Sequence, residues 1–240
     1  MGRGPSIEGR KNAEDAKRAK AFTKLIREIT IAARTGADPA VNARLRSGID
    51  KALSANMTKD TIERAIKRGS GADGADNMQE LRYEGYGPSG VALIIDAMTD
   101  NTQRTVADVR HALSKHGGNL GTSCSVAFQF HRVGEIVVDT SKPGSEDKLL
   151  EVALDAGADD VQSESGQSTV LSASDHFETV KKALVAAGFA PLRADVVMRP
   201  ENRVAVSDDV AETLRDLIDW LEGLDDVQEV YHNAALSEPN

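Results

Sequence analysis

The stretch GEIVVDTSKPGSEDKLLEVALDAGADDVQSESGQSTVLS, residues 134–172, decides the fold class of this chain. Its hydrophobic pattern predicts a strand over 135–139, then a helix over 146–156, then two short strands over 160–163 and 168–172. A strand, a helix and two further strands in this order predict an α/β domain.

The residues that follow extend the same pattern. They predict a second helix over 174–187 and a strand over 192–198, so the chain order becomes βαββαβ. This order is typical of a ferredoxin-like domain. We therefore predict such a domain over residues 134–203.

The segments on either side predict a second α/β domain that is split in the sequence. Before residue 134 we expect strands over 81–84, 91–97 and 126–130 and a helix over 102–116. After residue 203, Ser207 caps an acidic helix that ends near residue 224, and a strand follows over 227–231. This trailing helix and strand suit the incomplete ββαβ unit better than a free tail, so we predict one discontinuous domain, 79–133 and 204–240.

The first part of the chain predicts a helical domain over residues 1–78. Residues 1–11 are rich in Gly and are expected to be flexible, and residues 69–79 form a Gly-rich linker. Three helices are expected between them. The first covers 12–34, the second runs from the cap Asp38-Pro39 to residue 55 with Val41, Leu45, Ile49 and Leu53 buried, and the third covers 59–68 after the cap Thr58. The chain is thus predicted to be an α+β protein of three domains, a helical N-terminal bundle and two α/β domains, the last inserted into the middle one.

Charge is distributed unevenly between these parts. Residues 1–70 contain 16 Lys and Arg against 8 Asp and Glu, and residues 71–240 contain 13 against 30, so a net charge of +8 is followed by one of −17. Contact of the basic end with nucleic acid is the leading explanation of such an asymmetry. Two ordinary domains of different charge are the alternative.

The first predicted helix separates its apolar and basic residues. Phe22, Leu25, Ile26, Ile29 and Ala33 lie on one side, and the basic residues on the other are Lys17, Lys20, Lys24, Arg27 and Arg34. Such a row of cations can follow successive phosphates, and each contact releases condensed counterions. The alternative is a solvated helix face.

No motif in the sequence predicts an active site, a cofactor or a metal. Gly85, Gly87 and Gly90 match the spacing of a dinucleotide-binding loop, but a strand follows them instead of a helix, which predicts a hairpin. Cys124 with His111 or His116 as a base is a conceivable nucleophile, which we consider the weaker interpretation because both histidines fit ordinary helical positions. No Cys/His set has zinc-binding spacing and no calcium loop is present, and the acids of the last helix (Asp208, Glu212, Asp216, Asp219 and Glu222) fit a solvated face.

Cellular location is predicted from what the sequence lacks. No apolar run approaches the length needed to span a bilayer, and the N-terminus carries no secretory signal. A single cysteine fits a reducing compartment. We therefore expect a cytoplasmic protein with no membrane partner and no evident small-molecule substrate; the sequence carries no signal for its oligomeric state.

Several runs of sequence closely resemble the YebC family over nearly the whole chain. They are KNAEDAKRAKAFTKLIREI (11–29), RYEGYGPSG (82–90), TDN (99–101), VRHA (109–112) and KHGGNLG (115–121). Two departures stand out: the start Gly-Arg-Gly-Pro-Ser (2–6) differs from the Gly-His-Ser-Lys-Trp of many members, and Cys124 stands where a small residue such as glycine is expected.

The resemblance implies the same three domains and nucleic-acid binding without enzyme activity. Bacterial members are described as probable transcriptional regulators and the mitochondrial relative as a translational activator. The expected phosphate contacts are Arg10, Lys11, Lys17, Arg18, Lys20, Lys24 and Arg27. The partner is then DNA at promoters, or alternatively ribosomal RNA on the ribosome, where the protein would relieve stalled translation. Two further hypotheses are an enzyme that uses Cys124 and a protein-binding adaptor that uses the acidic domains.

Overall fold

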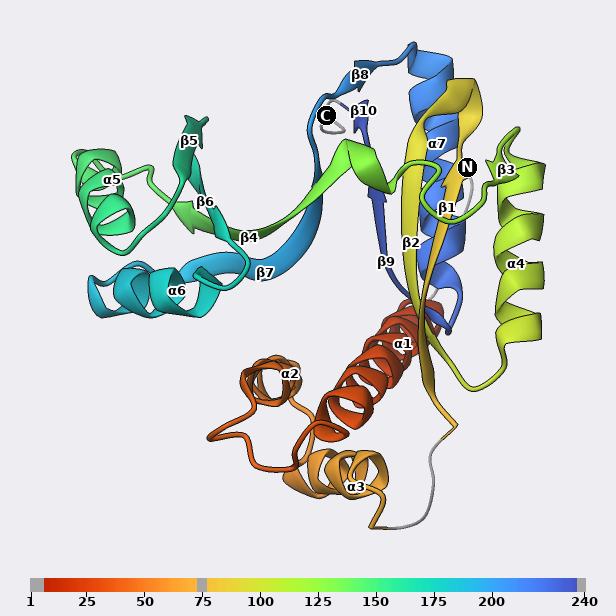
Figure 1. Ribbon diagram of the computed structural model, residues 1–240, viewed down its shortest axis with the longest axis horizontal. Helices are drawn as coiled ribbons and strands as arrows, with labels where there is room; N and C mark the ends of the chain where they lie inside the picture. Colours follow the sequence, from red (N-terminus) through yellow and green to blue (C-terminus); the bar gives the residue numbers. More distant parts are fainter. Residues whose placement is uncertain (1–6, 73–76, 237–240) are drawn as a thin grey trace. The chain divides into compact units, whose positions relative to one another are not determined.

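The computed structural model describes residues 7–72 and 77–236 and confirms an α+β protein with a helical N-terminal region and two four-stranded antiparallel sheets (Figure 1). The chain divides into two compact units. The first combines residues 1–126 with 204–240, and the second is 127–203. No helix within the described residues is long and apolar enough to cross a membrane.

The helical region consists of α1 (Ile7–Ala33), α2 (Ala43–Ser54) and α3 (Lys59–Gly69). Its core contains Ile29, Ala32, Ala33, Leu45, Ala52, Met57, Ile62 and Ala65, so the predicted apolar side of α1 does face the other two helices. The prediction of flexibility up to residue 11 is wrong for residues 7–11, which continue α1. A glycine inside a helix costs only about 1 kcal/mol, and a helix of 27 residues accommodates Gly9.

Helix α2 begins later than the sequence predicted. Asn42 is the N-cap: its side-chain oxygen accepts from the Leu45 amide at 3.0 Å, and its Nδ2 donates to the Ala32 carbonyl at 2.8 Å. The Asn42 side chain therefore joins the end of α1 to the start of α2. The Asp38 side chain only accepts a hydrogen bond from the Ala40 amide, in the turn before the helix. The predicted burial of Val41 and Leu53 is wrong, since these side chains are 83% and 43% exposed.

Helix α3 packs closely against α1 through a glycine. Thr58 caps α3 as predicted, its hydroxyl accepting from the Thr61 amide. At the other end of the helix, a Cβ on Gly69 would lie 2.0 Å from the Thr30 carbonyl oxygen, closer than two such atoms can approach. The crossing of the two helices at this point requires glycine.

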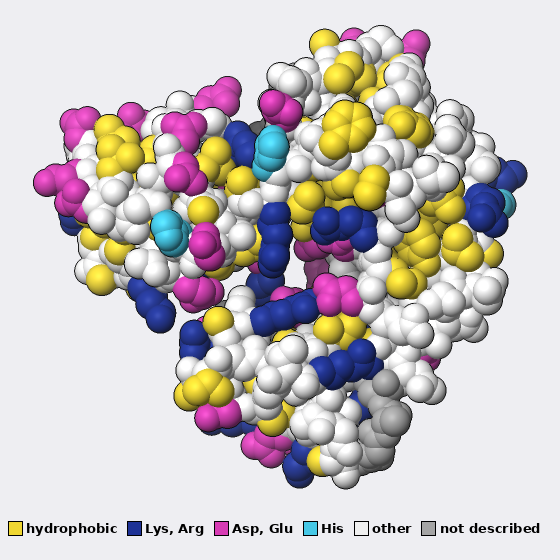
Figure 2. Space-filling model, in the orientation of Figure 1, with side chains coloured by type: hydrophobic (Ala, Val, Ile, Leu, Met, Phe, Trp, Pro, Cys, Tyr) yellow, Lys and Arg dark blue, Asp and Glu magenta, His cyan; other side chains and the backbone are white. Residues whose placement is uncertain are grey.

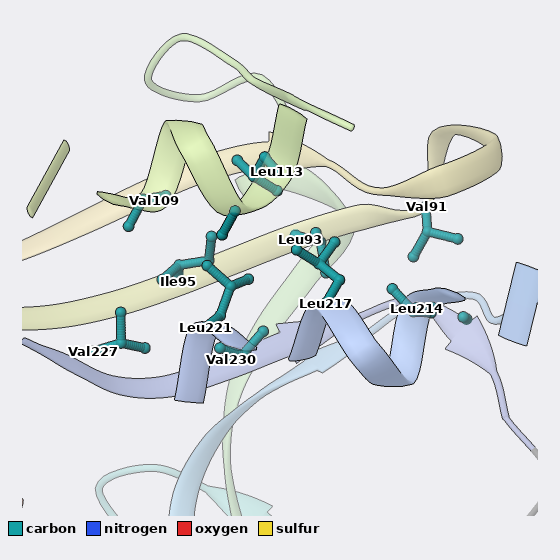
Figure 3. Packing of buried hydrophobic residues seen from close by; sticks show 12 residues of the cluster. Val91, Leu93, Ile95, Val109, Leu113, Leu214, Leu217, Leu221, Val227 and Val230 are labelled. Carbon is teal, nitrogen blue, oxygen red and sulfur yellow. The ribbon is translucent and has the colours of Figure 1, made fainter. Parts of the chain in front are cut away.

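The sheet of the first unit brings distant segments of the chain together. Its strands are β1 (Gln79–Tyr86), β2 (Ala92–Thr99), β3 (Asn119–Leu120) and β9 (Val227–His232), in the order β3-β1-β2-β9. Helices α4 (Thr102–Lys115) and α7 (Asp208–Gly223) pack against it. The shared core contains Leu93 and Ile95 of β2, Val109 and Leu113 of α4, Leu214, Leu217 and Leu221 of α7, and Val227 and Val230 of β9 (Figure 3).

The glycine-rich segment between β1 and β2 is a hairpin connection, as predicted. The two strands pair antiparallel from Gln79↔Thr99 to Tyr86↔Ala92, and the short 3-10 helix η1 (Pro88–Gly90) joins them. Gly90 has φ +74°, a conformation that favours glycine. Two further short strands, β8 (Val204–Ala205) and β10 (Ala234–Ala235), form a parallel pair.

The second unit has the βαββαβ chain order predicted from its sequence. Its elements are β4 (Phe130–Asp139), α5 (Ser145–Asp155), β5 (Asp160–Glu164), β6 (Gln167–Ala173), α6 (Phe177–Ala186) and β7 (Pro191–Pro200). The strand order is β5-β6-β4-β7, and side chains such as Ile136, Leu149 and Leu184 fill the space between sheet and helices. The predicted strand over 126–130 is wrong, because the 3-10 helix η2 (Ala127–Gln129) precedes β4.

Candidate nucleic-acid interface

The basic side of α1 is the candidate interface, and its residues differ in exposure. Lys17 and Lys20 are exposed, and Lys24 and Arg27 are partly buried. Arg18 is exposed and its guanidinium lies 5.2 Å from the centre of the Phe22 ring. The backbone of α1 includes Arg10 and Lys11, whose side chains lie outside the described part of the chain. Several Lys and Arg side chains show on the helical region in Figure 2, whereas Asp and Glu gather around α5 of the other unit.

Two lysines of α1 contact the segment that joins α7 to β9. Lys20 Nζ donates to the Gly223 carbonyl oxygen at 2.8 Å, and Lys24 Nζ lies 3.5 Å from the Gln228 carbonyl oxygen. Gly223 is the last residue of α7, where carbonyl groups lack helical partners and the helix dipole favours a cation. Lys20 therefore stabilises the end of α7 while remaining exposed.

Arg27 has a more enclosed position. Its Nη1 donates to the Met98 carbonyl at 2.8 Å, to the Asp225 carbonyl at 2.6 Å and to Asp226 Oδ1 at 2.7 Å. The side chains of Arg27 and Asp226 are 14% and 7% exposed. Arg27 thus joins α1 to the end of β2 and to the α7–β9 turn, and in this arrangement its guanidinium faces protein acceptors.

Asp226 is the centre of a buried polar network. Besides Arg27, it accepts from Arg104 Nε at 3.0 Å, from Arg104 Nη2 at 2.9 Å and from the Thr105 hydroxyl at 2.8 Å. Burial raises the pKa of the Asp226 carboxyl, but the hydrogen bonds from Thr105, Arg27 and Arg104 outweigh burial and hold the pKa below its ordinary value. The ionised carboxylate therefore ties α1, α4 and the α7–β9 turn together.

A groove with a volume of about 630 Å³ opens beside this network. Lys20, Arg27 and Arg104 contribute positive charge to its lining, and the acidic residues of the lining are Asp100, Asp108, Asp225 and Asp226. Four carboxylates against three cations give no net attraction for a phosphate group. The groove itself is therefore a poor phosphate site, and the exposed part of α1 outside it is the better one.

The acids next to the basic side of α1 include Glu222. Partial burial raises the pKa of the Glu222 carboxyl, the Lys24 ammonium lowers it, and Asp219 raises it. The net shift is upward. The Lys24 ammonium is thus close enough to act on the Glu222 carboxyl. The sequence pattern predicted that Glu222 lies on a solvated face. It did not identify Asp225 or Asp226 as part of the site, because the helix that they contact lies about 200 positions earlier in the chain.

The residues considered for catalysis make contacts within the fold. His116 caps the end of α4, with Nδ1 2.8 Å from the Ala112 carbonyl oxygen, and the rings of His111 and His116 both contact the Trp220 ring edge-on. Cys124 is exposed and has φ +65°, which explains why a small residue such as glycine is expected there.

A buried carboxylate holds the loop that contains Cys124. Glu84 is 7% exposed, and its two oxygens accept from the amides of Cys124 at 2.7 Å and Val126 at 2.8 Å. Within the described residues, no group of three or more His, Cys, Asp and Glu side chains is arranged to hold a metal ion. These hydrogen bonds to Glu84 of β1 explain how the loop is held in its conformation.

The fold and the basic helix together define a class of α+β proteins in which a basic helical region precedes two α/β parts. A family model for the TACO1/YebC protein N-terminal domain matches residues 4–72, and one for the TACO1/YebC second and third domain matches residues 78–234. The chain belongs to the TACO1/YebC family, which confirms the resemblance seen in its sequence.

Curated relatives and a solved structure cover nearly the same length. A probable transcriptional regulatory protein of Xanthomonas campestris pv. campestris is 57% identical over 236 residues, 97% of each chain. One of Methylococcus capsulatus is 58% identical over 235 residues, covering 97% of this chain and 94% of its own. The crystal structure of a conserved hypothetical protein from Aquifex aeolicus has a TM-score of 0.84 at 42% identity, covering 94% of this chain and 93% of that one.

Proposed function

We propose that this protein is a non-enzymatic, cytoplasmic regulator of gene expression that binds nucleic acid through α1, with promoter DNA as its target. The observation that carries the proposal is the net charge of +8 on residues 1–70, joined to a remainder of −17. Only the basic part attracts a polyanion, since the acidic part repels phosphate. The names of the bacterial relatives support a role in transcription.

The phosphate contacts are assigned to the cations of α1 that solvent can reach. Lys17 is exposed, and Lys20 and Lys24 continue its side of the helix toward the α7–β9 turn. Arg18 is exposed as well, but it lies nearer the apolar side of the helix, beside Phe22. Lys17 and Lys24 are separated by about 10 Å along the helix axis, a span suited to phosphates of one strand. Arg10 and Lys11 stay proposed as further phosphate contacts nearer the N-terminus. Arg27, which faces Asp226, is assigned to the attachment of α1 instead.

Replacing both Lys17 and Arg18 with Glu tests this assignment. We expect weaker binding to DNA and RNA, and a salt dependence (log affinity against log salt) whose slope falls by about 0.7–0.9 per lost phosphate contact. Lys181→Glu with Lys182→Glu on α6 is the matched control, because it makes the same charge change and also removes a cation next to a phenylalanine ring, that of Phe177. Equal affinities and slopes for both variants would contradict the proposal.

Ribosomal RNA is the second candidate target. The contacts proposed for these Lys and Arg side chains are all to phosphates, and such contacts position a protein but carry little sequence information. This favours a target recognised by its shape. Density-gradient sedimentation of a lysate, with and without nuclease, separates the two: ribosomal co-migration lost in the Lys17/Arg18 variant indicates translation, and recovery on discrete DNA sites indicates transcription.

A further inference from the structure

The basic side of α1 faces an acidic segment of the same chain. This segment, called here the acidic turn, comprises residues 222–228 and carries Glu222, Asp225 and Asp226. Its carbonyl groups accept from Lys20 and Lys24, and Asp226 accepts from Arg27. These backbone carbonyl oxygens and the Asp226 carboxylate offer a row of cations the same kind of acceptor as a strand of phosphates does.

We propose that the acidic turn competes with nucleic acid for the basic side of α1 and thereby holds the protein in a weakly binding state. The proposal rests on the function proposed above. Two of the four described cations assigned to phosphates, Lys20 and Lys24, are the ones that contact the turn. A phosphate strand that takes these two ammonium groups has to displace the turn from them.

The competition follows from the hydrogen bonds of the two lysines and from the position of Arg27. Lys20 and Lys24 keep their present carbonyl contacts only while α1 lies against the turn. Arg27 anchors α1 in that position, because it donates to the carbonyl groups of Met98 and Asp225 and to the Asp226 carboxylate. The apparent affinity for nucleic acid is then reduced by the fraction of molecules in which the turn is attached.

The sharpest test is a variant for which competition and simple phosphate contact predict opposite signs. Arg27→Gln removes a positive charge, so nucleic-acid binding weakens if Arg27 contacts phosphates. If Arg27 anchors the turn, the same variant releases Lys20 and Lys24, and binding becomes about fivefold tighter or more, the size of an ordinary coupling between two sites. Asp226 keeps Arg104 and Thr105 as partners in this variant.

Arg64→Gln is the matched control for the loss of charge. Arg64 lies in the same helical region, and its ion pair with Asp60 is confined to the exposed surface of α3. We expect this control to bind as the unaltered protein does or slightly more weakly. The probes are a labelled DNA duplex and a labelled RNA hairpin, titrated at several salt concentrations by fluorescence anisotropy.

A second variant changes the turn and leaves α1 intact. Glu222→Gln with Asp225→Asn neutralises two exposed acids of the turn and is expected to tighten binding. Asp208→Asn with Glu212→Gln removes the same charge at the other end of α7 and is the control. Both pairs lie on the surface, so thermal unfolding is sufficient to check that the variants fold.

The outcomes separate this inference from the proposed function. Tighter binding by Arg27→Gln and by the turn variant, each against its control, supports competition. Weaker binding by Arg27→Gln, together with a turn variant equal to its control, overturns competition and leaves nucleic-acid binding in place. Absence of binding by every form, with either probe at low salt, overturns the proposed function itself.

Discussion

At the scale of single residues, Asp226 is a buried carboxylate that joins three parts of the first unit. Asp226 is 5% exposed as a residue, and its carboxylate bonds to Arg27, Arg104 and Thr105. Loss of one partner from a buried ion pair leaves the other charges uncompensated, which costs several kcal/mol in measured cases. This residue connects the helical region to α4 and to β9, and so its charge affects the stability of all three.

The charge of Asp226 makes stability depend on pH in a defined direction. Its pKa is lowered in the folded protein, so the unfolded state binds more protons between the folded and unfolded pKa values. The stabilisation is complete above the unfolded pKa of about 3.9 and is lost as pH falls toward the folded pKa. Stability should therefore fall below about pH 4.

Asp226→Asn tests this dependence by urea unfolding from neutral pH to pH 3. We expect the variant to be less stable at neutral pH by about 3 kcal/mol, with the difference from the unaltered protein shrinking as the solution becomes more acidic. Asp216→Asn, which removes an exposed charge from α7, is the control and should be nearly neutral. A difference for Asp226→Asn that stays constant with pH would show that its ionisation is unimportant.

The role of a residue could be predicted from the sequence where its partner is close along the chain, and not where its partner is distant. Thr58 caps α3 through an amide three positions away, and this cap was predicted. The role of Arg27 was not predicted, because its acceptors Met98 and Asp226 lie 71 and 199 positions away in the chain. Charge and spacing place Arg27 correctly on the basic side of α1, but they do not reveal the carboxylate opposite it.

At the scale of elements, α1 has two packing sides. Its apolar side contacts α2 and α3, and its basic side contacts the acidic turn. The apolar side follows from hydrophobic periodicity and was predicted. The basic side resembled a solvated or phosphate-binding face, because a row of Lys and Arg has the same sequence pattern whether its partner is water, nucleic acid or protein.

The crossing of α1 and α3 leads to a prediction about Gly69. A methyl group there meets the Thr30 carbonyl at 2.0 Å and the Ala33 Cβ at 2.9 Å, so the helices have to separate. We expect Gly69→Ala to lower the free energy of unfolding by about 1–3 kcal/mol, although alanine favours helix. Glu63→Ala, at an exposed position of the same helix, is the control and should change stability little. Equal thermal stability of the two variants would contradict the close crossing.

At the scale of the whole molecule, the organisation into two compact units extends the sequence prediction of an inserted domain. We propose that the segment from β4 to β7 folds independently and is inserted into the other α/β domain. Its two ends are close: the Glu201 amide donates to the Gln129 carbonyl at 2.8 Å, and Phe130 pairs with Pro200. A short linker can therefore replace the whole segment without straining the rest.

Excision of residues 130–200, with Gly-Ser joining Gln129 to Glu201, tests the insertion. We expect a monodisperse remainder that unfolds cooperatively, because the core formed by β2, α4, α7 and β9 is untouched. Truncation after Ala205 removes α7 and β9 and exposes Leu93 and Ile95, so that product should aggregate. Size-exclusion chromatography and thermal unfolding distinguish these results. A soluble protein after truncation, together with an aggregated protein after excision of residues 130–200, would contradict the proposed insertion.

The order of the main helices and strands could be predicted because these elements are long enough to show a hydrophobic period. Helices of three turns or more and strands of five or more residues carry a clear period, and the βαββαβ order followed from them. The short strands β3, β8 and β10 were missed, since two residues cannot show a period. The start of α2 was misplaced because Asn42 forms contacts with the preceding helix that outweigh the Asp38-Pro39 signal.

The position of β9 beside β2 affects how the protein is made. β2 pairs Leu93 with His232, and the Asn233 side chain accepts from the Ala92 amide. During synthesis, β2 therefore emerges long before its neighbour, and one edge of this strand stays open while more than half of the chain is still being translated. The helical region and the segment from β4 to β7 can form first from local contacts, whereas the central sheet closes last. A nascent chain that stops before β9 keeps an unprotected strand edge and an uncovered apolar core, which are the features that chaperones and proteases recognise.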